Sequence, residues 1–452
     1  MRNFGKTYSA HYKSILMLGI PLLLGQLGVI ITGFADTVMV GRYSTQALAS
    51  ASFVNSMFTL MTILCMGYSY GLTPIVSALF ARGDEKRVGE MVKNSMVLNS
   101  VFGLLVGLFM LVIYFFIENL GQPDELLPTI KPYYIIVLLS MVPIVLINVL
   151  RQFTDGIGQT QVSMWILTLG NLLNIVGNYF LIYGVCGFPE WGLFGAGIST
   201  LFARIMMLMG YVAWIMIAKR YKSYVRGYRE GFVKRSSMKA VNNNSWPVSM
   251  QMGMETGIFT FATILVGWLG SDYLAAYQVV LVLSTFGFMV YYSFGASMAI
   301  KVANFDGLGD IEQLKLSVKA GYHIILGCAL LASLIFIFAG EWIIGWFTTD
   351  PVVVGISLSL IAPLVLYQFG DATQIAYANA LRGIKCVMPL MKFAFFAYVI
   401  IGLPSSYLFA FPFKGGAIGI YLSFVVALFV AGVLYWTRYR REIGKMQYTK
   451  NT

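Results

Sequence analysis

The chain has 452 residues, of which 58% are hydrophobic and 11% are charged, and it carries a net charge of +12. Soluble domains carry about 25% charged residues, so this composition excludes a soluble globular protein and predicts a membrane protein. Nucleic-acid binding is excluded as well, because it requires a basic face on a soluble module and the sequence contains none.

Long apolar runs recur along the whole chain. A membrane-spanning helix needs about 20 predominantly apolar residues. Such runs are continuous rather than alternating, which predicts helices and not a β-barrel. We therefore predict an all-α integral membrane protein with twelve transmembrane helices, centred near Ile30, Thr62, Gly107, Met141, Ile175, Met206, Thr260, Phe288, Leu331, Phe369, Tyr398 and Val426.

The basic residues predict the orientation of these helices. If the N-terminus is cytoplasmic, 27 of the 31 lysines and arginines fall in the tails and cytoplasmic loops. The outer loops then hold only Arg42, Lys131 and Lys414, while Arg204 falls within the sixth helix. This positive-inside pattern predicts a multi-pass protein of the cell inner (cytoplasmic) membrane with both termini in the cytoplasm. The same positive charge is expected to attract anionic membrane lipid.

The two halves of the chain resemble each other at an offset of 226 residues. At this offset Pro21 falls on Pro247, Gly41 on Gly267, and the pair Gly83-Asp84 on Gly309-Asp310. An offset of six helices keeps both repeats in the same orientation, which predicts parallel repeats around a central cavity, as in transporters that open alternately to each side.

We divide the chain accordingly into four parts. The six-helix N-terminal lobe is expected over residues 1–220 and the six-helix C-terminal lobe over residues 246–437. A basic cytoplasmic linker, residues 221–245, joins them, and residues 438–452 form a basic cytoplasmic tail.

Three acidic residues, Asp36, Glu255 and Asp371, lie inside apolar runs. A carboxylate at the centre of a bilayer costs about 2.5–3.5 kcal/mol, so such residues usually face a cavity and mark an ion path or a ligand site. Glu255 and Asp371 both lie in the second half, and Tyr367 precedes Asp371 by one helical turn. If these helices touch, the carboxylates form a site for Na⁺ or H⁺. The alternative for either acid alone is a protonated carboxyl that bonds a neighbouring hydroxyl.

A second group of polar residues lies in the first half. Asn174 and Asn178 form one polar stripe on the fifth helix, and Thr200 lies on the sixth. They are candidates to join Asp36, but asparagines at this spacing also form helix–helix hydrogen bonds, and Thr200 commonly bonds its own helix backbone.

Other functional classes find little support in the sequence. The four cysteines and two histidines do not form a transition-metal cluster, so we expect no cofactor. The stretch Gly5-Lys6-Thr7 lacks the preceding glycine and strand of a P-loop. A lipid-linked oligosaccharide flippase remains an alternative, although it would need basic residues in its cavity. An integral-membrane transferase would need an aspartate-rich motif or a membrane-level histidine, so we expect no enzyme.

The chain resembles the multidrug and toxic compound extrusion (MATE) family, in its NorM-like bacterial branch, from end to end. The likeness is carried by Pro21, Gln26, Asp36 and Gly41, by GNLLNIVGNYFLIYG followed by WGLFGAGIST, by PVSMQMGMETGIFTF and LAAYQVVLVLSTFGFMVYYSFGASMAIKV, and most specifically by LYQFGDATQIAYANALRGIKCVMP. One departure is Tyr277, where the family often has His, which puts a proton role at that position in doubt.

The resemblance implies two six-helix lobes and a cation-coupled antiporter that exports amphipathic, often cationic, drugs. It implies a C-lobe cation site at Glu255, Asp371 and Tyr367, and an N-lobe site at Asp36, Asn174, Asn178 and Thr200. It leaves Na⁺ and H⁺ both open as the coupling ion. We expect drug-like organic cations and membrane lipid as partners, and a monomer.

Overall fold

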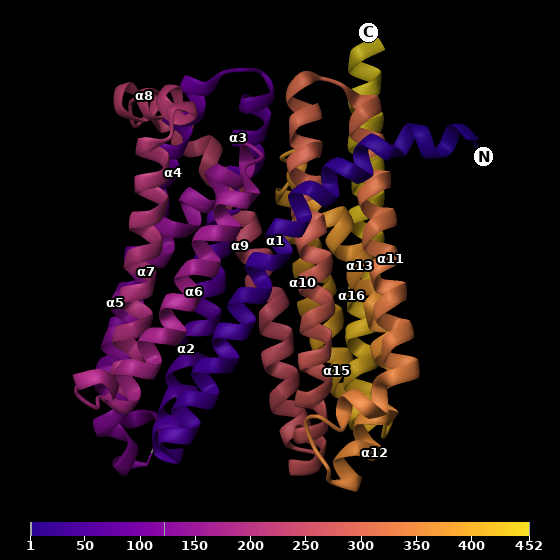
Figure 1. The fold of residues 1–452 in the computed structure, drawn as a ribbon. Coiled ribbons are helices and arrows are strands. Elements are labelled where there is room, and N and C mark those ends of the chain that lie inside the picture. The colour runs from indigo at the N-terminus through magenta and orange to yellow at the C-terminus, as the bar shows by residue number, and fades with distance from the viewer. Residues whose placement is uncertain (1, 122, 452) are drawn as a thin grey trace. The chain divides into compact units, whose positions relative to one another are not determined.

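In the computed structural model the chain is helical almost throughout (Figure 1). The structure describes residues 2–121 and 123–451, with side chains from residue 8 to residue 449, and no strand occurs in these ranges. The first half contains α1 (Arg2–Tyr43), α2 (Thr45–Ser69), α3 (Leu72–Ala81), α4 (Glu85–Phe115), α5 (Leu127–Gly156), α6 (Thr160–Tyr183), α7 (Gly192–Ile217) and α8 (Lys222–Glu230). Short 3₁₀ turns connect them at η1 (Ile117–Leu120), η2 (Asp124–Leu126), η3 (Val185–Gly187) and η4 (Lys219–Tyr221).

The second half follows the same plan. It contains α9 (Arg235–Gly267), α10 (Ser271–Leu308), α11 (Ile311–Ile344), α12 (Pro351–Ser359), α13 (Ile361–Gly383), α14 (Met388–Ala394), the π-helix η5 (Phe395–Gly402), α15 (Leu403–Ala410) and α16 (Gly416–Asn451). Residues 221–245 thus include α8 and the first turns of α9, and residues 438–451 continue α16 as a helix.

The predicted fold class, an all-α membrane protein, is confirmed. Among the described residues ten helices are long and apolar enough to cross a membrane, and the count is eleven if α12 and α13, which are bent by 43° at their break, are one span. α9 is the remaining long helix, and its apolar part after Pro247 contains the polar residues Gln251 and Glu255. Each of the twelve predicted span centres lies in one of these helical segments.

The two halves share a turn whose sequence explains its shape. Gly83 and Gly309 adopt positive φ angles of 76° and 69°, which glycine reaches without steric cost. The next residues, Asp84 and Asp310, are N-caps whose carboxylates accept backbone N–H groups of α4 and α11, at 3.2 and 3.1 Å. The repeated Gly-Asp pair therefore ends one helix and starts the next in both halves.

The chain folds into two compact units that do not coincide with its two sequence halves. One unit is Leu24–Ser249, and its hydrophobic core runs along α2, α4 and α5 through Val54, Phe58, Met110 and Tyr134. The other unit combines Met1–Leu23 with Met250–Thr452. Helices α1 and α9 therefore each pass from one unit to the other, within three residues of Pro21 and Pro247. The two crossing points are 226 residues apart, the offset of the sequence repeat.

Side-chain contacts hold each crossing helix in its unit. The start of α1 bonds to α11, where His11 Nε2 lies 3.0 Å from Gln313 Oε1 and the Tyr12 hydroxyl lies 2.8 Å from His323 Nδ1. The start of α9 bonds to α2 in the other unit: Tyr68 donates to Asn242 at 2.7 Å. Further along, Ser249 donates to the carbonyl of residue 64, also at 2.7 Å.

Candidate functional site

The carboxylate of Asp36 is bound by two asparagines of α6. Asn178 Nδ2 donates to Asp36 Oδ1 at 2.5 Å, and Asn178 is fully buried. The side-chain amide of Asn174 forms hydrogen bonds with both Asp36 and Thr200 when its nitrogen faces Asp36. In that orientation it donates to Oδ1 at 3.0 Å and accepts from the hydroxyl of Thr200 at 3.1 Å. The structure thus brings together all four residues that the sequence placed in the first-half site.

A small cavity of about 100 Å³ lies against this cluster. Asp36 and Thr200 line it together with Asn55 and Tyr133, and Tyr133 donates to Asn55 at 3.3 Å. Arg204 lies within electrostatic range of Asp36 and donates to the Ser140 hydroxyl at 2.5 Å. The negative charge of Asp36 is therefore opposed by a fixed positive charge in the same unit.

The second cluster lies in the other unit, between α9 and α13. Asp371 is 1% exposed, and neither of its carboxylate oxygens has a hydrogen-bond partner among the described residues. It lies within electrostatic range of Glu255, and Tyr367 interacts with both acids. The structure therefore brings the three residues of the predicted second-half site together as well.

Glu255 differs from Asp371 because polar side chains surround it. Gln251, one turn earlier on α9, donates to Glu255 Oε2 at 3.3 Å, and Gln374 of α13 also bonds this carboxylate. Arg382 in turn donates to Gln251 Oε1 at 2.8 Å and to the Tyr292 hydroxyl at 3.3 Å. A glutamine therefore couples the buried guanidinium to the buried acid.

Aromatic rings pack around Tyr367, one helical turn before Asp371. Tyr421 has its ring centre 6.1 Å from that of Tyr367 and 5.8 Å from that of Tyr277, and Phe259 lies 6.3 Å from Tyr367. Tyr277 is the position where the resemblance led us to expect His, and here it supplies a buried ring. Aromatic faces attract cations, so this wall suits a positively charged ligand.

Sequence reasoning missed several members of both clusters. Gln251 and Gln374 carry a usable signal, because they lie one helical turn from Glu255 and Asp371 and so share their helix faces. Arg204 lies one turn after Thr200 in the same way. Arg382 gave no such signal, because it lies near the end of α13 and reads as one more loop charge.

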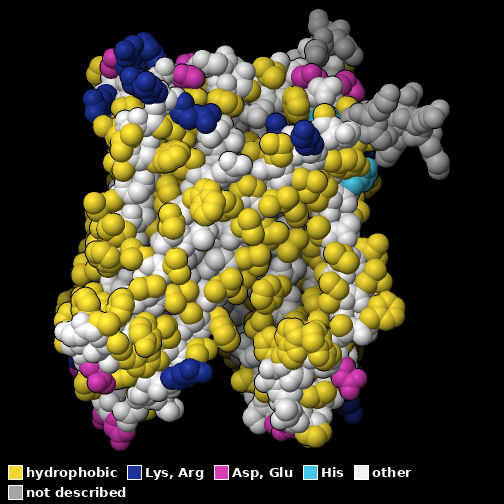
Figure 2. All heavy atoms as spheres, in the orientation of Figure 1, with side chains coloured by type: hydrophobic (Ala, Val, Ile, Leu, Met, Phe, Trp, Pro, Cys, Tyr) yellow, Lys and Arg dark blue, Asp and Glu magenta, His cyan; other side chains and the backbone are white. Residues whose placement is uncertain are grey.

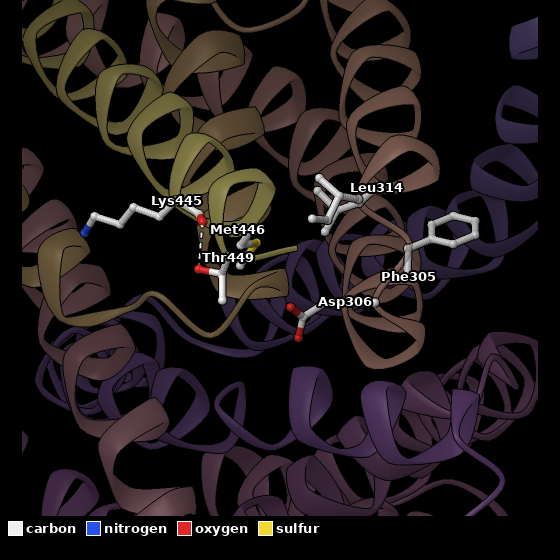
Figure 3. A pocket seen from close by; sticks show the side chains of 8 residues that line it. Phe305, Asp306, Leu314, Lys445, Met446 and Thr449 are labelled. Carbon is white, nitrogen blue, oxygen red and sulfur yellow. Dashed lines mark hydrogen bonds between the residues drawn. The ribbon is translucent and has the colours of Figure 1, made fainter. Parts of the chain in front are cut away.

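A larger cavity, of about 460 Å³, shares no lining residue with either cluster (Figure 3). It lies where α10 and α11 meet the end of α16, and Figure 3 shows Asp306 and Leu314 opposite Met446 and Thr449, while the side chains of Phe305 and Lys445 extend outward. The one carboxylate among its lining residues, Asp306, is paired with Lys385. This cavity therefore offers no free charge to a cation.

Comparison with known families identifies the chain. The MatE family model matches it twice, over residues 21–180 and 247–408. The two matches begin 226 residues apart, which confirms the internal repeat predicted from the sequence. The chain belongs to the MatE family and is a NorM-like membrane transporter.

Relatives and solved structures agree with this assignment. The chain is 30% identical to the multidrug resistance protein PmpM of Pseudomonas aeruginosa, over 97% of this chain and 93% of that protein. It is 29% identical to the multidrug resistance protein NorM of Vibrio cholerae, over 95% of this chain and 96% of that protein. A solved structure described as MATE in the bent conformation superposes with a TM-score of 0.90 at 18% identity, covering 98% of this chain and 97% of that one. This last likeness shows the fold.

Proposed function

We propose that this transporter exports amphipathic, often cationic, drugs across the cell inner membrane by alternating access, and that inward movement of Na⁺ or H⁺ drives the export. The relatives named as multidrug resistance proteins support drugs as the substrate class. The observation that carries the ion coupling is the bare carboxylate of Asp371 in the interior of a membrane protein.

A buried carboxylate without a partner is costly. An ionised group in a medium of low dielectric constant is tolerated only when it is paired, coordinates a cation or takes up a proton. Asp371 has no hydrogen-bond donor among the described residues, and its charged neighbour Glu255 carries the same sign. A Na⁺ ion or a proton satisfies both requirements at once, because it neutralises the charge and occupies the oxygens.

The charges of the two units favour the second-half site for the coupling ion. In the unit Leu24–Ser249, Asp36 faces Arg204 and two asparagine donors, so its charge is compensated internally. In the other unit the cluster contains two acids, Glu255 and Asp371, and of the two the charge of Arg382 acts on Glu255 alone. One monovalent cation at Asp371 completes the balance there.

The energy available from such an ion is sufficient for export. One charge that moves inward across a potential of about 100 mV releases about 2.3 kcal/mol. This supports roughly fifty-fold accumulation at full coupling, since about 1.4 kcal/mol corresponds to a factor of ten. For exchange against a monovalent cationic drug the electrical contribution cancels, and the ion gradient alone supplies the drive.

Reconstituted vesicles test the proposal. The purified protein is placed in liposomes, a Na⁺ gradient and a pH gradient are imposed separately, and uptake of a fluorescent cationic dye is followed. We expect one of the gradients to drive transport. Asp371→Asn and Glu255→Gln are each expected to abolish it, while the protein remains folded in the membrane.

The matched control is Glu312→Gln, which removes an exposed acid at the start of α11 that is paired with Lys315. This variant should transport as the unchanged protein does. Dye movement that persists when both gradients are collapsed would contradict ion coupling. Full transport by the Asp371→Asn protein would contradict the assignment of the ion to this site.

A further inference from the structure

A short amphipathic helix, α8, lies at one end of the unit Leu24–Ser249, beside α4 (Figure 1). Its buried face consists of Tyr224 and Gly227, the preceding Tyr221 of η4 is buried as well, and the other face of α8 is exposed and basic. The backbones of α8 and α4 touch: a Cβ at Gly89 would lie 2.1 Å from the Tyr224 carbonyl oxygen, and one at Gly227 would lie 2.1 Å from that of Lys86. The helix is therefore seated firmly on the bundle.

Next to this contact, α8 covers an apolar cavity of about 260 Å³. Its walls come from α4, α5 and α7, and the side chains that line it are almost all hydrophobic, including Val92, Met96, Leu150, Phe153 and Ile215. The rim contains Val212, Met216 and Tyr228, which are 46%, 52% and 38% exposed. The cavity is thus an apolar slot whose rim lies on the outer surface of the unit.

Positive charge gathers at the same place. Figure 2 shows a cluster of lysine and arginine side chains over this end of the unit, around α8. The nearby acids are already engaged, since Glu230 pairs with Arg226, Glu90 with Lys234, and Glu85 accepts from Tyr224. By contrast, the side chains of Lys219, Lys222 and Arg229 have no ion-pair or hydrogen-bond partner among the described residues, and Arg229 lines the cavity itself.

We propose that this cavity is a binding site for an anionic phospholipid. Part of one acyl chain occupies the slot, and Arg229 and Lys222 bind the phosphate of the head group. Apolar surface below a cluster of basic side chains is the arrangement that recognises an acidic lipid, because the tail is removed from water while the phosphate keeps its counter-charges.

The size of the cavity argues against the exported drug as its occupant. Pockets for drug-sized ligands usually measure about 300–1,000 Å³ and present a few convergent polar groups. This cavity is smaller, and apart from Arg229 and the Tyr228 and Tyr224 hydroxyls its lining is apolar. Exposed apolar residues continue beside it at Trp214 and Ile217, as expected where a helix bundle meets lipid.

Native mass spectrometry of the detergent-solubilised, full-length protein tests the proposal. The protein is titrated with phosphatidylglycerol and, separately, with phosphatidylcholine. We expect one phosphatidylglycerol molecule to bind more tightly than phosphatidylcholine. The double variant Lys222→Gln/Arg229→Gln should weaken its binding roughly thirty-fold, the effect of two basic residues near an acidic lipid head group.

Two further variants separate the parts of the site. Val212→Trp should fill the slot from its rim and abolish tight binding with all charges retained. The control Arg440→Gln/Arg441→Gln removes two exposed charges near the end of α16 and should leave binding unchanged.

Three results would overturn the proposal. Equal losses of lipid binding in the two double variants would show that only the net charge of the protein matters. Unchanged lipid binding by the Val212→Trp protein would show that the acyl chain does not occupy the slot. Displacement of the lipid by glycerol 3-phosphate or inorganic phosphate at equal concentration would show that an anion alone satisfies the basic residues.

Discussion

Arg382 acts on Glu255 through another side chain. Its guanidinium donates to Gln251, which donates to Glu255, and the arginine is only 6% exposed. A buried charge of this kind stabilises the fold only while its hydrogen bonds and its counter-charge are present. The same arginine that compensates one acid therefore also holds α9 and α13 together near the Asp371 site.

Replacing Arg382 tests this role. Arg382→Met should lower the free energy of unfolding by about 1.5–3 kcal/mol, the usual value of a hydrogen bond to a charged group, because the Gln251 amide loses its partner. Chemical denaturation in detergent measures the effect. Arg441→Met, which changes an exposed arginine of α16, is the control and should leave stability unchanged.

A second buried charge pair lies near the end of α5. Arg151 Nε lies 3.6 Å from Asp155 Oδ2, and Asp155 accepts from the Ser163 hydroxyl at 2.6 Å. The two charged residues are 8% and 4% exposed. Asp155→Leu alone should destabilise the protein by about 3–5 kcal/mol, since it removes the carboxylate that faces a buried arginine.

The double variant Arg151→Met/Asp155→Leu should recover most of that loss, because no charge remains to be desolvated. Thermal unfolding followed by tryptophan fluorescence compares the three proteins. A double variant less stable than Asp155→Leu alone would contradict the explanation.

At the scale of elements, close backbone packing decides where α8 lies. Gly89 and Gly227 allow its backbone to touch that of α4, and the apolar slot lies beside this contact. Another helix is irregular: the span over residues 388–410 is not α-helical throughout, because it contains the π-helix η5 immediately before α15. Pro404, the second residue of α15, cannot donate to the carbonyl one turn earlier, which favours a widened turn there.

The glycine contact makes a prediction for α4. Gly89→Ala should destabilise the protein by about 1–3 kcal/mol, because its methyl group would overlap the backbone of α8. Gly107→Ala, in the same helix, meets no atom within 4 Å and should be neutral or slightly stabilising. Thermal unfolding of the two variants side by side measures the difference. Equal effects would show that the close approach of the two helices is not required.

The elements also show how much the sequence could predict. Continuous apolar runs predicted the membrane helices, since only a helix satisfies its own backbone in lipid. Asp36, Glu255 and Asp371 stood out because an acid within such a run is costly. The residues around them depend on tertiary contacts: Arg382 reaches Glu255 only after α9 and α13 pack together, and Gln251 alone resembles any helix glutamine. The passage of α1 from one unit to the other has no signal beyond Pro21.

At the scale of the whole molecule, the two halves share a fold but not a charge pattern. The family model matches both, yet the residue 226 positions after Asp36 is the buried Ala262, and the residue 226 positions before Asp371 is the core residue Val145. Packing alone would be served by similar residues in both halves. The difference therefore supports separate roles for the two acidic clusters.

The predicted orientation can be tested with a native cysteine. Cys186 lies in η3 between α6 and α7, in a predicted outer loop, and is the one exposed residue of the four cysteines. A membrane-impermeant maleimide applied to intact cells should therefore label the protein, and Cys186→Ser should abolish the labelling. Labelling only after the cells are opened would reverse the orientation.

Cys386 is the internal comparison for this experiment. It lies between α13 and α14, in a predicted cytoplasmic loop, and burial raises the pKa of its thiol. It should react slowly even in opened cells, because the thiolate is the reactive form and less of it is present.

The exchange of helix segments between the units has a consequence for biogenesis. The unit Leu24–Ser249 is incomplete until the start of α9 has been synthesised, since Tyr68 and the carbonyl of residue 64 receive their partners from there. The first residues of α1 must in turn wait for α11, which emerges far later from the ribosome. Neither half of the gene therefore encodes a self-sufficient folding unit, and two fragments separated between α8 and α9 would have to complement each other in the same membrane.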